Sequence, residues 1–406
     1  MNISVLIVDD EELILRGLRR TLRSNRKEWD VEFANSGHVA LEMLASKTYE
    51  VIVSDMRMPG MNGNELLAEV KRLYPGMVRI ILSGHADKGL ILESTCLAHQ
   101  YLAKPCDGKD LESAIDRCRY LHSLLLSDEL SQLVAGLSSV PSLPDLYLEV
   151  VQILEDESMD LRDAGDVIER DPGMSMKVLQ LVNSAFFGLQ RSISRAADAV
   201  GYLGSSTLKA LVLSTKIFSE YAGGKDLAYS AKDTADRGLR CGLLAQRIAK
   251  EMEASDELVD HALLAGALHD VGEMILACNM PQRVAKVWQL IDSEGLENEA
   301  AESQILGSTH AEVGAYLLNL WGIPQPIVEA VALHHHPGDC CADEFNVLTA
   351  VHIAIALEAL GQDPNADFEE GAPIPGLDME YLERVGVSDR LQGWAEMAIL
   401  AGREAS

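Results

Sequence analysis

Residues 51–63, VIVSDMRMPGMNG, hold the pattern that decides the fold of the first part of this 406-residue chain: a short, mainly apolar run that ends at Asp55. Similar runs occur at Val5–Val8, Val31–Ala34, Val78–Leu82 and Tyr101–Ala103. Stretches with helical spacing separate them, as at Leu13, Gly17, Leu18 and Leu22 and at Leu66, Leu67, Val70 and Leu73. Five strands alternating with helices predict an α/β fold, a doubly wound five-stranded parallel sheet covered on both faces.

Three aspartates follow two of these predicted strands. Asp9 and Asp10 end the first strand, and Asp55 ends the third. In a doubly wound sheet these strands are neighbours, so the three carboxylates meet at the edge where ligands bind. A divalent cation relieves their repulsion, and a few oxygen ligands with room for water suit Mg²⁺.

Two more polar residues end neighbouring strands: Ser83 follows the fourth and Lys104 the fifth. A carboxylate nucleophile, a metal, a cation and a hydroxyl are the groups needed for phosphoryl transfer to a side chain. The alternative is that Asp9 or Asp10 only caps the following helix. Helix capping would explain one of the carboxylates. It would not explain why residues suited to phosphoryl transfer follow four different strands.

Four motifs now support a family resemblance. LIVDDEE (6–12), VIVSDMRMPGMNG (51–63), ILSG (81–84) and YLAKP (101–105) resemble the receiver domain of two-component response regulators, over residues 1–122. The resemblance implies a flavodoxin-like fold with Asp55 as the phosphoacceptor. It also implies a Mg²⁺ ion held by Asp10 and Asp55, by Asp9 through water, and by the backbone carbonyl of Arg57.

The same resemblance implies roles for three residues beside the metal. Ser83 and Lys104 would contact the phosphoryl group, and Tyr101 would turn inward when Ser83 moves. Such a domain catalyses only its own phosphorylation, and its partner is a sensor histidine kinase or a phosphotransfer protein. Basic residues on the first predicted helix form either a docking patch for that partner or a solvated face; they are Arg16, Arg19, Arg20, Arg23 and Lys27.

The remainder of the chain is predicted to be helical. From Leu111 a helix with apolar or small positions to Leu125 either docks on its own sheet or forms the seam of a homodimer. After Ser139 strand-like alternation gives way to segments of helical period. They are Asp163–Ile168, Ser175–Val182, Thr207–Ser219, Leu239–Met252, Glu257–Leu276 and Glu312–Leu320, and a final helix is expected near Asp389–Ala401.

A set of histidines raises the question of a second site. His269-Asp270 lies within the apolar run 265–276, and His310, His334, His335 and His336 follow. These are ligand types of a metal phosphohydrolase, in which the metal generates hydroxide. The alternative is a buried histidine paired with its neighbouring carboxylate. Phosphohydrolases of this type take two further ligands from other helices, but here the position of the first histidine falls on or beside Cys241, and no aspartate occurs in 351–358.

Residues 140–337 resemble the HDOD (HD-related output) domain, most clearly in IERDPGMSMKVLQLVNSAFFG (168–188) and HAEVGAYLLNLWGIP (310–324). The resemblance implies an all-α fold related to HD phosphohydrolases, generally without a complete catalytic set. No G-Y-P tripeptide follows the histidine triplet. We therefore expect a receiver (1–122), a helical linker (123–139), an HDOD domain (140–337) in which no metal is expected, and a helical extension (338–406).

The distribution of charge along the chain excludes some classes of function for the helical part. The formal charge is 34 − 63 = −29, of which residues 1–122 carry 16 − 18 = −2 and the remainder 18 − 45 = −27. Val287–Glu383 holds 18 acidic residues and no Lys or Arg. Such a surface repels DNA and anionic membranes, which favours an output that acts through protein–protein interaction.

The rival hypothesis is a metal-dependent HD-type phosphodiesterase for a cyclic dinucleotide, or a nucleotide-binding output. A phosphate pocket needs cations, and Arg237 and Arg240 remain candidates to supply them. Seven cysteines without a C-x-x-C pair indicate reduced thiols, with a vicinal disulfide or metal grip at Cys340-Cys341 as the alternative. No apolar run approaches a membrane span, so a cytoplasmic protein is expected.

Overall fold

The computed structural model describes most of the chain, namely residues 3–22, 29–83, 97–104, 111–115, 128–137, 141–142, 144–155, 160–183, 193–204, 208, 219–220, 231–361 and 374–405. It divides into two compact units. The first comprises Met1–Glu169, Gly173–Glu220 and Tyr316–Ile323; the second comprises Arg170–Pro172, Tyr221–Ala315 and Pro324–Ser406. Among the described residues, no helix has the length and apolar character needed to cross a membrane.

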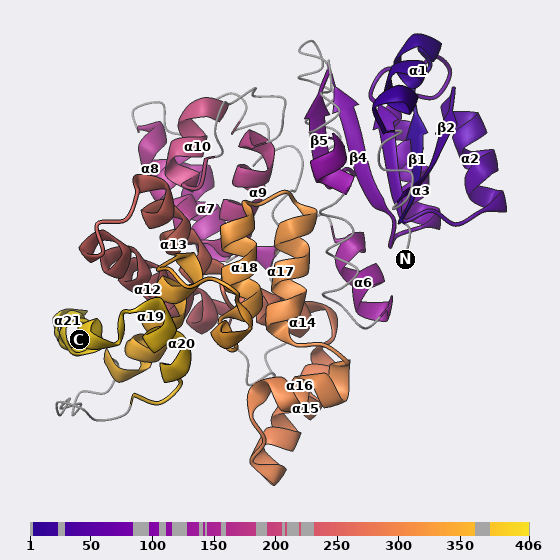
Figure 1. The fold of residues 1–406 in the computed structure, drawn as a ribbon. Helices are drawn as coiled ribbons and strands as arrows, with labels where there is room; N and C mark the ends of the chain where they lie inside the picture. The colour runs from indigo at the N-terminus through magenta and orange to yellow at the C-terminus, as the bar shows by residue number, and fades with distance from the viewer. Residues whose placement is uncertain are drawn as a thin grey trace. The chain divides into compact units, whose positions relative to one another are not determined.

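The first unit contains the predicted five-stranded sheet (Figure 1). Its order is β2-β1-β3-β4-β5, and every neighbouring pair is parallel. The strands are β1 (Ile3–Val8), β2 (Trp29–Ala34), β3 (Val51–Asp55), β4 (Val78–Ser83) and β5 (Gln100–Ala103). All residues of β3 and β4 are buried, as expected for strands covered on both faces. The predicted α/β fold is confirmed.

Within the described residues, three helices accompany these strands: α1 (Glu12–Thr21), α2 (Gly37–Ser46) and α3 (Gly63–Leu73). Asn62 begins α3 with a capping box, in which its side chain accepts from the Glu65 N–H and Glu65 accepts from the Asn62 N–H. The helix predicted from the spacing at Leu13, Gly17, Leu18 and Leu22 is present, and its buried positions are Leu15, Leu18 and Leu22, whereas Leu13 is 79% exposed.

A buried arginine joins β4 to the helix α6 (Asp128–Gly136). Arg79 is 1% exposed and donates to the backbone oxygens of Leu97, Pro75, Met77 and Ala135. His99 accepts from the Arg79 backbone N–H through Nδ1 and lies 2.8 Å from the Ala135 oxygen through Nε2. Burial and the nearby Arg79 charge hold the pKa of His99 well below its usual value. This network fastens the end of α6 to β4.

The rest of the first unit is helical, with one exception among its described residues. The elements are β6 (Pro141–Ser142), α7 (Pro144–Glu155), α8 (Leu161–Glu169), α9 (Pro172–Val182), α10 (Ala196–Leu203) and β7 (Ser219–Glu220). The strands β6 and β7 form a two-residue parallel pair that the all-helical prediction for 140–336 did not include. Most of the predicted helix at Thr207–Ser219 and most of the one that starts at Leu111 lie outside the described residues, and Ser219 itself belongs to the strand β7.

The second unit is built from helices (Figure 1). The elements are α12 (Ala231–Glu251), α13 (Asp256–Leu268), α14 (Val271–Asn279), α15 (Pro281–Glu294), α16 (Asn298–Leu306), α17 (His310–Leu320), α18 (Gln325–Leu333), η3 (Pro337–Asp339), α19 (Val347–Gly361), α20 (Met379–Val385), η4 (Ser388–Arg390) and α21 (Leu391–Ala405). Helices α12, α13, α18 and α19 pack on one another. The predominantly helical prediction is confirmed, including the final helix.

The prediction of one helix across Glu257–Leu276 is wrong, because the helix breaks at His269-Asp270. Asp270, with φ −100° and ψ 15°, leaves helical geometry between α13 and α14. The break turns α14 toward α17, where a Cβ on Gly272 would lie 1.9 Å from the His310 carbonyl oxygen. A side chain at Gly272 would therefore keep Asp270 away from His310.

Candidate functional site

The predicted acidic pocket forms at the carboxyl edge of the sheet. Val8 pairs with Ser54, so Asp9 and Asp55 follow neighbouring positions of β1 and β3. Asp9, Asp10 and Asp55 each offer a carboxylate oxygen within 4.8 Å of the others. Asp9 and Asp55 are buried and Asp10 is exposed, so a bound cation would keep access to water. This donor set fits the hard, partly hydrated Mg²⁺ ion.

Lys104 compensates the buried negative charge. Its Nζ lies 2.7 Å from Asp9 Oδ2 and 2.7 Å from Asp55 Oδ1. Burial raises the pKa of Asp55, against the lowering effect of Lys104. The pKa of Lys104 is raised although burial opposes it, because Asp55 and Asp9 both accept from its ammonium group. Lys104 therefore offsets part of the negative charge of the two buried carboxylates, Asp9 and Asp55.

Three further predicted residues lie on nearby segments. Ser83 ends β4, is 2% exposed, and its Oγ has no hydrogen-bond partner among the described residues. Tyr101 lies in β5 and is 3% exposed, so it occupies the inward position. Arg57 lies exposed two residues after Asp55. The free hydroxyl of Ser83 is thus available to a group that arrives beside Asp55.

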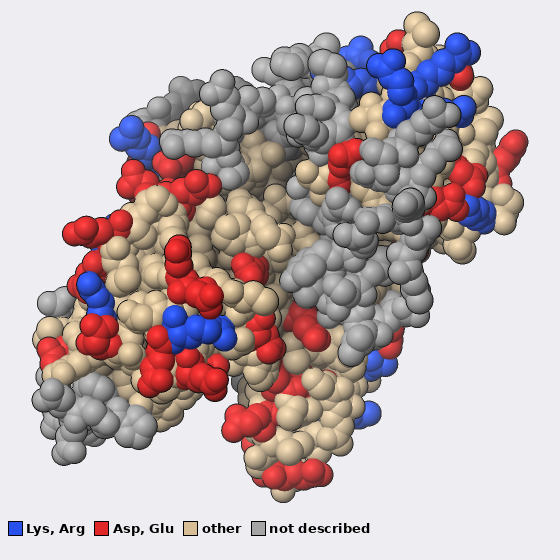
Figure 2. Space-filling model, in the orientation of Figure 1, with Lys and Arg blue, Asp and Glu red and all other residues tan. Residues whose placement is uncertain are grey.

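The basic residues of α1 gather at one end of the unit (Figure 2). Arg16, Arg19 and Arg20 are exposed. Arg16 pairs with Glu12 at 3.3 Å, and the Arg19 guanidinium lies 4.7 Å from the centre of the Phe33 ring. Arg23 and Lys27 lie outside the described residues. These arginines are therefore accessible to solvent. Their exposure agrees with both alternatives, a docking patch for a partner and a solvated face.

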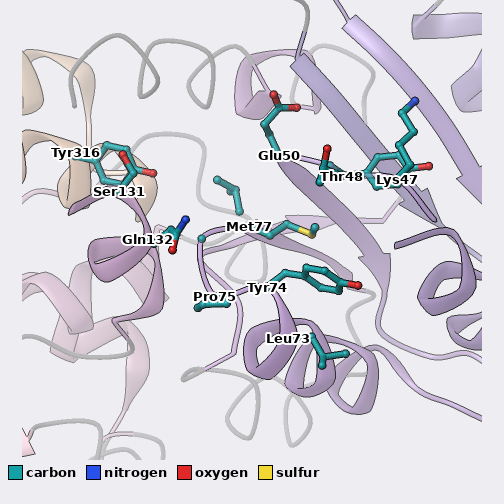
Figure 3. Close-up of a pocket in the computed structure, with 13 residues that line it drawn as sticks. Lys47, Thr48, Glu50, Leu73, Tyr74, Pro75, Met77, Ser131, Gln132 and Tyr316 are labelled. Atoms are coloured by element: carbon teal, nitrogen blue, oxygen red, sulfur yellow. The ribbon is translucent and has the colours of Figure 1, made fainter. Parts of the chain in front are cut away.

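A separate pocket of about 360 Å³ lies away from the aspartates (Figure 3). Thr48 and Glu50 precede β3, and Pro75 and Met77 precede β4, so this pocket lies at the amino ends of the strands. The lining residues are Lys47, Thr48, Tyr49, Glu50, Leu73, Tyr74, Pro75, Gly76, Met77, Val78, Ser131, Gln132 and Tyr316. The three aspartates lie at the opposite edge.

In the second unit, the five predicted residues of the HD cluster come together. His269 and Asp270 lie at the break between α13 and α14, His310 begins α17, and His334 and His335 follow α18. Asp270 Oδ2 lies 2.7 Å from His269 Nε2, and Asp270 Oδ1 lies 3.5 Å from His310 Nε2 and 3.9 Å from His334 Nε2. His335 Nε2 lies 3.2 Å from His310 Nε2. His336 points elsewhere and pairs with Glu299.

The positions that lack ligands hold other groups. Cys241 is fully buried, and burial raises the pKa of its thiol. One turn earlier on α12, Arg237 donates to Asp270 and Glu273. His352, on the helix where an aspartate was expected, donates through Nδ1 to the His334 carbonyl oxygen at 2.9 Å. Of the two candidate cations, Arg237 reaches the cluster, whereas Arg240 pairs with Glu358.

Burial and neighbouring charges shift the pKa values of two histidines of the cluster in opposite directions. Burial, together with the neighbouring histidines, holds the pKa of His334 well below its usual value. Although burial opposes protonation of His310, its hydrogen bond to Glu302 and the charges of Glu302 and Asp270 raise its pKa to about 9. Glu302 and Glu273 were not identified from the sequence, since nothing local marks them. Cys340 and Cys341 are free thiols, so the vicinal disulfide is absent.

The observed architecture is thus a parallel α/β sheet with an acidic carboxyl edge, followed by a mostly helical region that holds a histidine cluster. A family model described as "Response regulator receiver domain" matches residues 5–116, and one described as "HDOD domain" matches residues 140–337. The chain therefore belongs to the two-component response regulators, with a receiver followed by an HDOD domain. A receiver domain implies a histidine kinase or phosphotransfer protein as its partner.

Individual relatives match parts of the chain. An uncharacterized protein of Treponema pallidum (strain Nichols) is 25% identical over 200 residues, 49% of this chain and 38% of that protein. The DNA-binding transcriptional regulator NtrC of Escherichia coli (strain K12) is 37% identical over 118 residues, 28% of this chain and 24% of NtrC. The chain thus spans less than half the length of either relative.

One solved structure is similar to the N-terminal part. It is the signal receiver domain of an HD domain-containing protein from Pseudomonas fluorescens Pf-5, which is 32% identical. The match covers 30% of this chain and 99% of that one, with a TM-score of 0.29.

Proposed function

We propose that phosphorylation of Asp55 controls an HDOD output that acts through protein–protein interaction. The observation that supports this proposal most directly is the pocket around Asp55, where Lys104 Nζ lies 2.7 Å from Oδ1 and two further aspartates face the same space. Labelling of the full chain by acetyl phosphate in the presence of Mg²⁺ tests the proposal at Asp55.

In the proposed reaction, a carboxylate oxygen of Asp55 forms a bond to phosphorus as the bond from phosphorus to the donor atom breaks. Mg²⁺, held by Asp10 and Asp55, by Asp9 through water and by the Arg57 carbonyl, would offset charge on the transferred group. Lys104 moves from the carboxylates to a phosphoryl oxygen. The phosphoryl group adds about −1.5 to −2 charges and new acceptor oxygens.

The new acceptor gives the Ser83 hydroxyl a hydrogen-bond partner, which it lacks among the described residues. When Ser83 donates to it, the end of β4 shifts and Tyr101 on the neighbouring β5 follows. Phosphorylation thereby changes the populations of two states of the β4–β5 side of the receiver. The receiver catalyses only its own phosphorylation in this scheme.

Charge supports a protein-binding output. The stretch Val287–Glu383 offers 18 carboxylates and no Lys or Arg, and clusters of acidic side chains outnumber basic ones on the visible face of the helices (Figure 2). Such a surface disfavours nucleic acid and anionic membranes. We therefore propose a downstream protein partner for a regulator that works in the cytoplasm.

A second function is supported by the convergence of the HD cluster. His269, Asp270, His310, His334 and His335 lie together, as an HD-type phosphodiesterase requires. Cys241 and His352 at the terminal ligand positions weigh against it. Hydrolysis of cyclic di-GMP with and without Mn²⁺ distinguishes the two functions, since turnover that disappears in His269→Ala would replace the protein-binding output by catalysis.

Replacing Ser83 by alanine is expected to leave the unphosphorylated chain as stable or more stable, by up to about 1 kcal/mol, because it removes a buried hydroxyl that has no hydrogen-bond partner among the described residues. The phosphorylated chain should lose a charge-assisted hydrogen bond of roughly 1.5–3 kcal/mol. Melting temperatures with and without acetyl phosphate measure both effects. Ser46→Ala, at an exposed site on α2, is the control. A full phosphorylation-induced shift in Ser83→Ala would contradict the role of Ser83.

A further inference from the structure

The hydrogen bonds of three histidine rings in the HD cluster fix which nitrogen carries the proton. His310 Nδ1 donates to Glu302 Oε2 at 2.8 Å, and His334 Nδ1 donates to the Val331 carbonyl oxygen at 2.8 Å. His269 Nδ1 donates to the Gly266 carbonyl oxygen at 2.7 Å. Because these oxygens can only accept, each Nδ1 holds a hydrogen, and in the neutral ring Nε2 is a bare lone pair.

The Nε2 atoms of His310, His334 and His335 converge on one another and on a carboxylate, whereas His269 Nε2 is paired with Asp270 Oδ2. His310 Nε2 lies 3.5 Å from Asp270 Oδ1 and 3.2 Å from His335 Nε2. His334 Nε2 lies 3.9 Å from the same Asp270 oxygen. It is buried and has no hydrogen-bond partner among the described residues. Acceptor groups that face one another in a buried space repel unless a cation lies between them.

The spacing of these atoms suits a single transition-metal ion. At a metal–nitrogen distance of about 2.0–2.1 Å, neighbouring ligands of a tetrahedral site are about 3.4 Å apart. The separations of 3.2, 3.5 and 3.9 Å bracket that value. Glu302 on His310 and the Val331 carbonyl on His334 are the outer hydrogen bonds that metal-bound imidazoles characteristically make.

We propose that the HDOD domain binds one divalent first-row transition-metal ion through Nε2 of His310, His334 and His335 and Oδ1 of Asp270. Three imidazoles and one carboxylate suit ions of the zinc and iron class better than Mg²⁺. His335 is exposed and gives the ion access from solvent. This site goes beyond the proposed function, and it departs from the expectation of no metal in this domain.

The site holds one ion because the second carboxylate oxygen of Asp270, Oδ2, is already paired with the cationic side chain of Arg237. Asp270 Oδ2 accepts from Arg237, whose guanidinium also reaches Glu273 at 3.4 Å. The same oxygen lies 2.7 Å from His269 Nε2. Arg237 thus provides positive charge where a two-metal site would place its second ion, and Cys241 fills the position of a further histidine.

Cobalt titration of the full-length, chelator-treated protein tests the site. Excess Mg²⁺ occupies the acidic pocket of the receiver, so that Co²⁺ reports on the HD cluster. We expect one Co²⁺ per chain, with a visible ligand-field band and without a thiolate charge-transfer band. His335→Gln should abolish this binding, and Glu302→Gln should weaken it by roughly 10–100-fold.

The matched control is His336→Gln, since His336 is the adjacent exposed histidine and pairs with Glu299 outside the cluster. It should bind Co²⁺ as the unaltered chain does. His334→Gln serves as a second ligand variant, and circular dichroism verifies that each variant is folded.

Four results would overturn the proposal. They are absence of Co²⁺ binding under Mg²⁺, equal binding by folded His335→Gln, two Co²⁺ ions per chain that both depend on His310, and a thiolate band that reveals a cysteine site. Absence of binding would mean that protons, and not a metal, hold the cluster together. Because Asp55 takes no part in this titration, its outcome does not depend on the phosphorylation proposal.

Discussion

Asp55→Asn is expected to abolish labelling of the chain by acetyl phosphate. The amide cannot act as the carboxylate nucleophile, and it removes one of the two negative charges that share the Lys104 ammonium group. Asp9 stays paired with Lys104 at 2.7 Å, so the edge of the sheet keeps its cation and the domain should remain folded. Incorporation of radiolabelled phosphate, followed by gel filtration, measures the effect.

The control for this experiment is Asp30→Asn. Asp30 lies at the start of β2, pairs with Lys47 and has a side chain that is 55% exposed, so its loss leaves the acidic pocket unchanged. It should be labelled as the unaltered chain is. Undiminished labelling of Asp55→Asn would show that another carboxylate accepts the phosphoryl group, and the assignment of Asp55 would fail.

Gly272→Ala is expected to produce the largest loss of stability in the helical unit. The new Cβ would lie 1.9 Å from the His310 carbonyl oxygen, a backbone atom that cannot turn aside. Helices α14 and α17 must separate, and we expect the free energy of unfolding to fall by about 3 kcal/mol, the upper end of the usual cost of overpacking. Because Asp270 and His310 would move apart, Co²⁺ affinity should fall as well.

Gly393→Ala provides the comparison within the same unit. Its Cβ meets nothing within 4 Å on the exposed side of α21, so alanine should raise the free energy of unfolding by up to about 1 kcal/mol. Urea unfolding of the two variants measures the difference. If Gly272→Ala unfolds at the same urea concentration as Gly393→Ala, the close approach of α14 and α17 does not exist in solution.

The receiver could be predicted from the sequence because its signals are local. Each strand is a short apolar run, and each polar residue of the pocket directly follows a strand, so the carboxyl-edge rule brings Asp9 and Asp55 together without knowledge of the packing. Leu13 shows where local spacing fails. Several faces of α1 offer leucines, and only packing against the sheet selects Leu15 and Leu18.

The HD cluster could be predicted only in part. The histidines are visible in the sequence, but apolar spacing runs through His269-Asp270, and the helix break there depends on the contact of Gly272 with α17. The pairing of Arg237 with Asp270 is likewise tertiary: it requires α12 to approach α13 at Gly242, where a Cβ would lie 2.4 Å from the Leu263 carbonyl oxygen. Both arrangements therefore depend on glycines, Gly272 and Gly242, that let helices from different parts of the chain approach closely.

The contacts of the buried Arg79 indicate at which residue a fragment that contains the receiver should end. A fragment that ends at residue 122 would lack Ala135, whose carbonyl oxygen accepts from Arg79 and lies 2.8 Å from His99. The guanidinium would lose one of its four carbonyl acceptors and the cover that α6 gives it. For biochemical work on the receiver alone, the natural end of the fragment therefore lies after α6, near Leu137, and a shorter one should be less soluble and less stable.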